Sequence, residues 1–246
     1  MKNIDEVIIE LDKIIDWAEK NQSTDGYFAA LYRRMTIAVK EGIANNQFVD
    51  GPRMVLLDIV FAKRYLEAFE NKQTGKEVSM AWQSAFSAEK TDHITVIQHL
   101  LLGINAHINL DLGIAASQIA TPESLESLEK DFNKINIIIA NLIDDTKLRL
   151  SHIWLPFRIF TSYLDTESDG IVNFSIKVAR SFSWESTKQL VHSQKGNRLI
   201  LIDKIDKNVA VLANRIINPS RITKGILMIM KWGERGSIAD KIKILK

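Results

Sequence analysis

Apolar residues recur at intervals of three and four along most of this chain, and the strict alternation that marks a strand is rare. This spacing gathers apolar side chains on one face of a helix. The prolines and glycines fall mostly between the periodic segments, where they would end helices. The pattern predicts helices over residues 3–20, 26–46, 52–71, 77–87, 92–119, 122–149, 151–166, 171–193 and 198–217.

Two of these helices begin at recognisable start signals. Thr121-Pro122-Glu123 combines a capping hydroxyl, a proline at the first helical position and an acid in the first turn. Asp50-Gly51-Pro52 offers the same signal for the helix over 52–71. Elsewhere, Asp169-Gly170 and Lys195-Gly196-Asn197 predict turns, and Pro219 closes the last predicted helix.

The length of 246 residues suits one domain, since single hydrophobic cores stop growing at roughly 250–300 residues. We therefore predict an all-α, single-domain bundle of about eight to ten helices, packed around a buried central helix at about 92–119. The helical domain would span residues 1–217. The tail over 218–246 would be a helix docked on the domain or a contact in a homo-oligomer.

Composition and charge narrow the class of protein. Lys and Arg (32) nearly balance Asp and Glu (30), and no basic run interleaved with aromatics is present, so nucleic acid is not the expected partner. The absence of cysteine excludes disulfides and thiolate metal sites and suits the cytoplasm. Acids near Met1 argue against a signal peptide, and we expect no integral membrane segment.

The predicted central helix carries two polar stripes among its leucines and isoleucines. At 100° per residue, one side holds His99, Gly103, His107 and Asp111, and the other holds Gln98, Asn105 and Asn109. Buried polar groups need hydrogen-bond partners from neighbouring helices. Asp58 and Asp131 are candidates, because each occupies a position of an apolar row on its own predicted helix.

His107 and Asp111 are one helical turn apart, so both side chains can reach one metal ion. With Asp131 as a third ligand, the sequence predicts a divalent metal site for Zn, Fe or Mn. His99, His107 and Asp58 are the candidate catalytic residues, with His99 as a general base or hydrogen-bonding group. The alternative is that Asp111 only fixes the tautomer of His107 within a core network.

A second set of polar residues lies on the helices over 26–46 and 52–71. Arginines bind carboxylates and other anionic groups through paired hydrogen bonds, and some of them could instead pair with Asp58 or Asp131. An exposed, solvated helix face is the alternative. The candidate substrate-binding residues are Tyr32, Arg33, Arg53, Arg64, Asn105 and Asn109, and the candidate pocket-lining residues are Trp82, Trp154, Phe157, Arg158, Asn173 and Trp184.

Three segments of the chain resemble a family catalogued as a domain of unknown function (number 5995). They are Tyr27-Phe28-Ala29-Ala30-Leu31-Tyr32-Arg33-Arg34, Asp50-Gly51-Pro52-Arg53-Met54 with Arg64-Tyr65-Leu66, and His99-Leu100-Leu101-Leu102-Gly103 with His107-Ile108-Asn109-Leu110-Asp111. The resemblance covers roughly residues 1–215 and implies a bacterial protein. It carries over no established activity, ligand or catalytic residue.

Three functions fit these observations. The first is a metal-dependent enzyme, of hydrolase or oxygenase type, whose core pocket acts on a small molecule with an anionic or polar group. The second is a metal-free pocket that binds, or acts on, a small apolar or amphipathic molecule. The third is an interaction module in which the polar stripes are only a satisfied core network.

Overall fold

The computed structural model describes residues 1–91, 93–154 and 176–246, except for the side chains at 136, 139–141, 143, 144, 176 and 177. This part of the chain forms eleven α-helices and no strand, so the predicted all-α, single-domain fold is confirmed. The first four helices are α1 (Ile4–Asn21), α2 (Asp25–Ala44), α3 (Gly51–Gln73) and α4 (Met80–Ser87).

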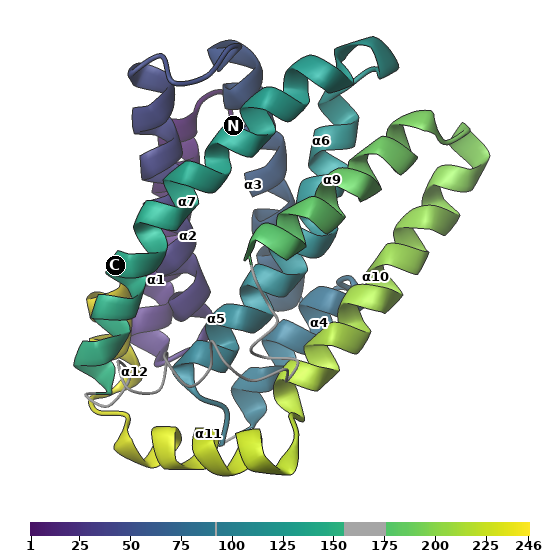
Figure 1. The fold of residues 1–246 in the computed structure, drawn as a ribbon. Helices are drawn as coiled ribbons and strands as arrows, with labels where there is room; N and C mark the ends of the chain where they lie inside the picture. Colours follow the sequence, from purple (N-terminus) through teal and green to yellow (C-terminus); the bar gives the residue numbers. More distant parts are fainter. Residues whose placement is uncertain (92, 155–175) are drawn as a thin grey trace.

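The centre of the fold is one continuous helical rod with an unusual middle. It consists of α5 (Val96–Ile104), the π-helical segment Asn105–Leu112 and α6 (Gly113–Ile119). Helices α1 to α3 lie on one side of the rod, and α9 (Ile176–His192) and α10 (Lys195–Ile217) lie on the other (Figure 1). Because neighbours surround it, the rod is buried, as the sequence predicts.

The rod is also the one helical stretch among the described residues that is apolar and long enough to cross a membrane. Its most apolar window, within Val96–Ile119, is 94% buried in the structure. A helix in the core of a bundle has this same property.

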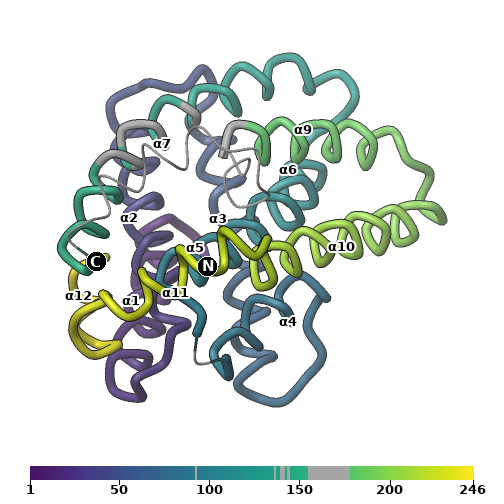
Figure 2. The backbone as a smooth tube through the Cα atoms, turned by 60° about the horizontal axis from the view of Figure 1, so that its bottom comes forward, coloured from purple at the N-terminus to yellow at the C-terminus, as the bar shows by residue number. Residues whose placement is uncertain are grey.

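The remaining helices enclose this centre. A short 3₁₀ turn at Pro122–Ser124 leads into α7 (Leu125–Ile153), while α11 (Arg221–Gly233) crosses one end of the bundle and α12 (Ile238–Leu245) packs on α1, α2 and α7. Figure 2 shows α11 as the link between α10 and α12. The tail thus folds into two docked helices.

Most predicted boundaries have the chemistry expected of them. Asp50 caps α3 by accepting a hydrogen bond from the Arg53 N–H at 2.9 Å. The central rod begins at 96 rather than 92, because Thr95 and Gln98 form a capping box there. Thr121 and Ser124 form another at the start predicted for residue 122.

Two predicted breaks are wrong. Helix α7 continues through residues 149–151 to Ile153, since no glycine or proline interrupts 125–153. Lys195-Gly196-Asn197 is predicted as a turn between helices, but it is the first turn of α10. The helix begins directly after Gln194, whose backbone is extended. Three predictions fall wholly or partly outside the described residues: the turn at Asp169-Gly170, the rest of the helix predicted over 151–166, and the beginning of the helix predicted over 171–193.

Candidate functional site

The carboxylate of Asp111 is the centre of a hydrogen-bond network inside the bundle. Arg64 Nε, from α3, donates to Oδ1 at 2.7 Å, and Trp82 Nε1, from α4, donates to Oδ2 at 2.8 Å. His107 Nδ1 lies 3.1 Å from the same Oδ2, one turn earlier on the rod. Both Asp111 and His107 are 1% exposed, so this network is shielded from water.

These contacts determine how His107 is protonated. A carboxylate paired with an arginine accepts hydrogen bonds, so Nδ1 of His107 carries the hydrogen and Nε2 carries the lone pair. Burial lowers the pKa of His107, which keeps the ring neutral, while the contact with Asp111 raises the pKa by less. Phe61 stacks on the ring with a centroid separation of 3.6 Å and an interplanar angle of 8°. The orientation of Nε2 is thereby fixed.

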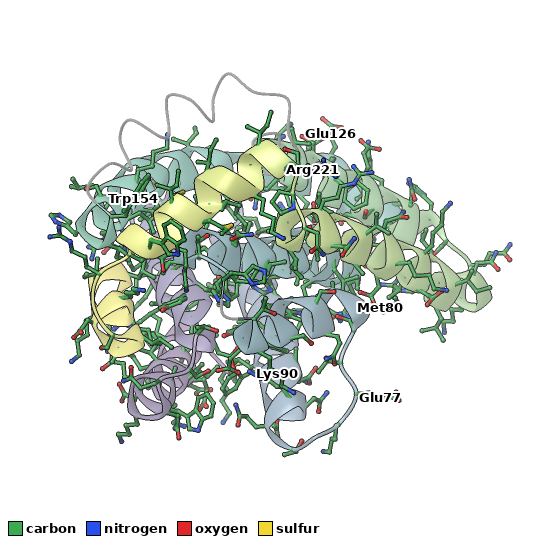
Figure 3. All side chains as sticks on the ribbon, turned by 90° about the horizontal axis from the view of Figure 1, so that it is seen from below. Glu77, Met80, Lys90, Glu126, Trp154 and Arg221 are labelled. Carbon is green, nitrogen blue, oxygen red and sulfur yellow. The ribbon has the colours of Figure 1, made fainter. Side chains whose placement is uncertain are left out.

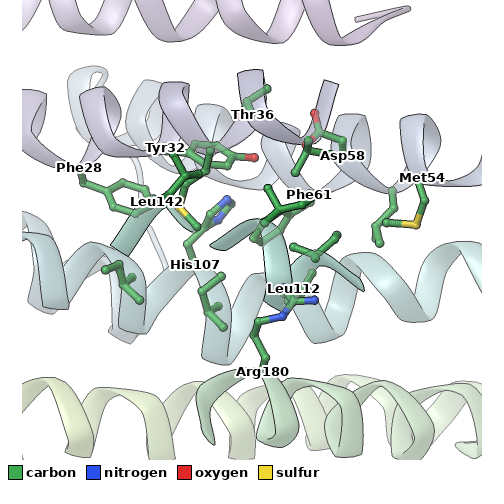
Figure 4. A pocket seen from close by; sticks show the side chains of 17 residues that line it. Phe28, Tyr32, Thr36, Met54, Asp58, Phe61, His107, Leu112, Leu142 and Arg180 are labelled. Carbon is green, nitrogen blue, oxygen red and sulfur yellow. The ribbon is translucent and has the colours of Figure 1, made fainter. Parts of the chain in front are cut away.

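A cavity of about 60 Å³ lies beside His107, between α2, α3, the central rod, α7 and α9 (Figure 4). One water needs about 10–15 Å³ of such space, so the cavity has room for roughly four to six water-sized groups. Most of its wall is apolar. The lining side chains include Phe28, Met35, Val39, Met54, Leu57, Phe61, Ile104, Ile108, Leu112, Ile135, Ile138 and Leu142.

Four polar atoms interrupt this apolar wall. Tyr32 Oη, Thr36 Oγ1, Asp58 Oδ2 and His107 Nε2 are all buried, and none forms a hydrogen bond of normal geometry with the described residues, although the Thr36 hydroxyl is near enough to offset slightly the rise in the pKa of Tyr32 that burial causes. They come from three elements: the consecutive helices α2 and α3, and the π-helical segment, which lies more than 30 residues after α3. Figure 4 shows these side chains around the same space. An unsatisfied buried polar group costs about 1–3 kcal/mol of stability. A molecule that forms hydrogen bonds with these four atoms would remove that cost, and this would favour its binding.

The charge states of these groups follow from burial. Burial raises the pKa of Asp58 to about 7, so near neutral pH its carboxyl group can either donate or accept a proton. Burial, together with the nearby Asp58 and Asp111, raises the pKa of Tyr32 well above its usual value, which keeps the phenol neutral. Apart from Arg180, the cavity therefore presents neutral hydroxyls, a neutral imidazole and one carboxyl group that titrates.

Arg180 of α9 also lines the cavity, and the sequence reasoning missed it. Its guanidinium lies over the Phe132 ring, 4.2 Å from the centroid, and Nη2 donates to the Phe132 carbonyl at 2.6 Å. Burial lowers the pKa of Arg180 to about 9. The arginine lies in the row Ala179, Ser183, Trp184, Thr187 and Leu190, which is buried throughout. Its place in that row was the signal that could have identified it.

Several residues predicted for the site lie elsewhere. His99 lines a separate hollow of about 20 Å³ with Asp25 and Trp82, and its ring lies edge-on to Tyr27 at 5.8 Å. Burial, and after it the charge of Lys231, lowers the pKa of His99 to about 3. His99 and His107 do not line a common cavity, so joint action on one substrate loses its geometric basis.

The second polar stripe of the rod faces α10. Asn105 Nδ2 donates to the Val209 carbonyl at 3.0 Å, and Asn109 Nδ2 donates to Asn105 Oδ1 at 2.9 Å. Gln98 Nε2 donates to the Ile216 carbonyl at 2.8 Å. The prediction that these amides meet a neighbouring helix is confirmed for Gln98 and Asn105, whereas Asn109 bonds within the rod, and none of the three lines the cavity.

Arg33 and Arg53 also lie away from the cavity. Arg33 Nε donates to Asp12 at 2.6 Å, between α2 and α1. Arg53 Nη2 donates to Asp131 Oδ2 at 3.3 Å, and Asp131 also accepts the backbone N–H groups of Val49 and Asp50 at 2.6 and 2.9 Å. Asp131 thus fixes the start of α3, which is the alternative pairing that the sequence left open.

Among the described residues, this arrangement places no third ligand beside His107 and Asp111 for the predicted metal site. Asp131 is engaged at the start of α3, and no group of three or more His, Cys, Asp or Glu in the described ranges is placed to hold an ion. A metal on His107 and Asp111 stays a prediction.

The candidate pocket-lining residues are spread over the molecule. Trp82 lines the hollow near His99, Trp184 packs on Phe132 and Trp154 contacts Gly233. Phe157, Arg158 and Asn173 lie outside the described residues.

The fold and the site together define a class: all-α, single-domain proteins with a largely apolar internal cavity lined by a few unpartnered polar atoms. The chain belongs to the family of unknown function DUF5995, whose model matches residues 4–219. No curated protein and no solved structure matches the chain. The resemblance inferred from the sequence is confirmed, and the α11–α12 tail lies beyond the matched residues.

Proposed function

We propose that this protein binds a small, mainly apolar molecule with a hydroxyl group in the cavity beside His107, without a metal. The observation that carries the proposal is the set of four unpartnered buried polar atoms in an otherwise apolar wall. Ligand pockets have this character, with apolar walls for affinity and a few polar groups for orientation.

A hydroxyl group suits these atoms better than other polar groups. His107 Nε2 offers only a lone pair and needs a donor, whereas the hydroxyls of Tyr32 and Thr36 can act either way. Asp58 can donate when protonated and accept when ionised. A ligand hydroxyl both donates and accepts, so it can satisfy two of these groups at once.

The same groups support acid–base chemistry on the bound molecule. A catalytic acid or base works best when its pKa lies near the operating pH, and burial brings Asp58 into that range. His107, held by Asp111, would act as the base that receives a ligand proton. We further propose that the protein is bacterial, as the family resemblance implies, and cytoplasmic, in line with its lack of cysteine.

Methyl NMR with four small probes tests the binding proposal. Butanol, pentane, butyrate and butylamine are similar in size and match the cavity's room for roughly four to six groups. Met35 and Met54 line the cavity, whereas Met80 and Met228 are exposed, so the labelled methionine methyls report where a probe binds. At no more than about 1.5 kcal/mol per atom, butanol would bind with a Kd no tighter than about micromolar.

We expect butanol to shift the Met35 and Met54 signals saturably, and at lower concentrations than pentane. Asp58→Leu should weaken butanol binding relative to pentane, while Asp203→Leu on the exposed face of α10 should leave both unchanged. Tighter binding of butyrate than of butanol would indicate an anionic ligand, against the proposal. Equal shifts at all methionines, or none, would mean that the cavity takes no ligand of this size.

A further inference from the structure

Helix α11 has a second apolar face that does not pack on the part of the chain that the structure describes. Its inner face buries Thr223, Leu227 and Met230. Its outer face exposes four large apolar side chains: Ile222 at 71%, Met228 at 40%, Ile229 at 61% and Trp232 at 81%. At 100° per residue these four residues fall on one continuous side of the helix, with Gly225 open between them.

The fold presents this outer face at an end of the molecule. Helix α11 lies across one end of the bundle in Figure 1, and it lies in front of the neighbouring helices when the molecule is viewed from below in Figure 3. Its 13 residues make a rod about 20 Å long. Large exposed apolar side chains grouped in this way mark a surface that meets another molecule.

Charge indicates what kind of molecule covers it. Residues 219–233 contain Arg221, Lys224 and Lys231 and no acid. The whole tail over 219–246 has seven Lys or Arg against two Asp or Glu, which gives it a charge of +5 and leaves −3 for the rest of the chain. On α11 itself, Arg221 and Lys224 are exposed beside the apolar face, whereas Lys231 bonds to the Ile94 carbonyl.

A second copy of the chain is the less suitable partner. In a symmetric dimer through α11, the outer face of each copy would meet the same face of the other copy, so two faces that each carry Arg221 and Lys224 would be brought together. Both are exposed, and no acid on the helix offsets their charge. Like charges across an interface oppose association, whereas a negatively charged surface would be attracted.

We propose that the outer face of α11 binds the surface of an anionic lipid bilayer. Helices that lie in a membrane interface combine an apolar face that includes tryptophan with flanking Lys and Arg. Here Trp232, Ile229, Ile222 and Met228 enter the boundary between headgroups and acyl chains, and Arg221 and Lys224 contact lipid phosphates. The helix lies flat on the bilayer without crossing it, and the bundle remains on the water side.

Vesicle co-sedimentation with the full chain tests this proposal. We expect binding to vesicles of mixed phosphatidylglycerol and phosphatidylcholine to be at least about tenfold stronger than binding to phosphatidylcholine alone, and to weaken as salt is added. Tryptophan fluorescence should shift to shorter wavelength on binding. The shift should be largely lost in Trp232→Phe, because Trp232 is 81% exposed, whereas Trp82 and Trp184 are buried and Trp17 and Trp154 are partly buried.

Matched variants test whether binding depends on the apolar face of α11 or on any exposed apolar side chain. The double variant Ile229→Asp with Trp232→Ser should lower binding to the mixed vesicles at least about tenfold. Leu199→Asp, at a 75% exposed position on α10, should bind as the native chain does. Because all three positions are exposed, circular dichroism should show the native fold in each variant.

Three results would overturn the proposal. The first is absence of binding to the mixed vesicles. The second is binding that the double variant leaves unchanged. The third is a concentration-dependent dimer that the double variant converts to a monomer, since a second copy would then be what covers α11.

Discussion

At the scale of single residues, the cavity depends on one carboxyl group that the fold buries without a partner. Asp58 is 7% exposed, and its Oδ2 has no hydrogen-bond partner among the described residues. Asp111, which is more deeply buried, accepts hydrogen bonds from Arg64, Trp82 and His107. The difference explains their separate roles: Asp111 fixes the site, while Asp58 remains able to titrate against a ligand.

The stability of the protein should therefore depend on pH through Asp58. Its pKa is about 7 in the folded state and near 3.8 in the unfolded state, so between these values only the folded chain holds the proton. Raising the pH through this window destabilises the fold, by up to about 4 kcal/mol above pH 7. Asp58→Asn cannot ionise, so in urea unfolding it should match the native chain near pH 4 and exceed it at pH 8.

Asp203→Asn is the control for this measurement, because Asp203 is exposed on α10. It should change the free energy of unfolding by less than about 0.5 kcal/mol at either pH. If Asp58→Asn gave the same gain at pH 4 as at pH 8, the buried and uncompensated charge would not be its cause.

At the scale of elements, the central rod combines close packing at one glycine with an unusual helical geometry in the segment that follows. A side chain at Gly103 would meet the ring of Phe28 at 2.4–2.8 Å, so only glycine lets α2 approach here. The π-helical segment that follows contains both His107 and Asp111. π-Helical turns are rare and are found frequently at functional sites, which agrees with the cavity beside His107.

Gly103→Ala tests this packing. The added methyl group should displace Phe28, which lines the cavity, and lower the free energy of unfolding by about 1–3 kcal/mol. Gly225→Ala is the matched control: it adds the same methyl group to exposed α11, where nothing lies within 4 Å, and should stabilise the chain by about 0.5–1 kcal/mol. Chemical unfolding monitored by circular dichroism measures both. An unchanged Gly103→Ala would show that Phe28 moves without cost.

At the scale of the whole molecule, the tail is part of the folding unit although it lies beyond the residues that the family model matches. Leu227 and Met230 of α11 and Ile242 and Leu245 of α12 are buried in the main core. Ile242 packs against Gly26 of α2, and Lys231 Nζ donates to the Ile94 carbonyl at 2.7 Å, next to the start of the rod. The tail thus holds together helices from both ends of the chain.

Deleting residues 219–246 should therefore unfold the protein. Burial of these four large apolar side chains contributes up to about 6–12 kcal/mol, which is comparable to the total stability of a typical domain. The milder Ile242→Ala should cost about 2–5 kcal/mol, while Ile229→Ala, at a 61% exposed position, should change little. Urea unfolding measures these differences. A truncated chain with native stability would show that residues 219–246 do not contribute to the stability of the fold.

The helices, the buried rod and the family could all be predicted from the amino-acid sequence. Helical periodicity, caps such as Asp50 and the glycine and proline breaks are local, so they can be recognised without knowing how the chain folds back. The polar stripes on residues 98–111 were correct as faces of a helix, and Gln98 and Asn105 do meet α10.

Which polar groups pair could not be predicted, because it depends on how the helices pack against one another. Periodicity gives the face on which a side chain lies, but it gives neither the neighbouring helix nor the height at which the two helices meet. Asp111 meets Arg64 and Trp82, which lie 47 and 29 residues away, and Asp131 meets the start of α3 instead of the rod. The cavity is what these pairings leave: the space where Asp58 and His107 Nε2 are buried and no protein partner reaches them among the described residues.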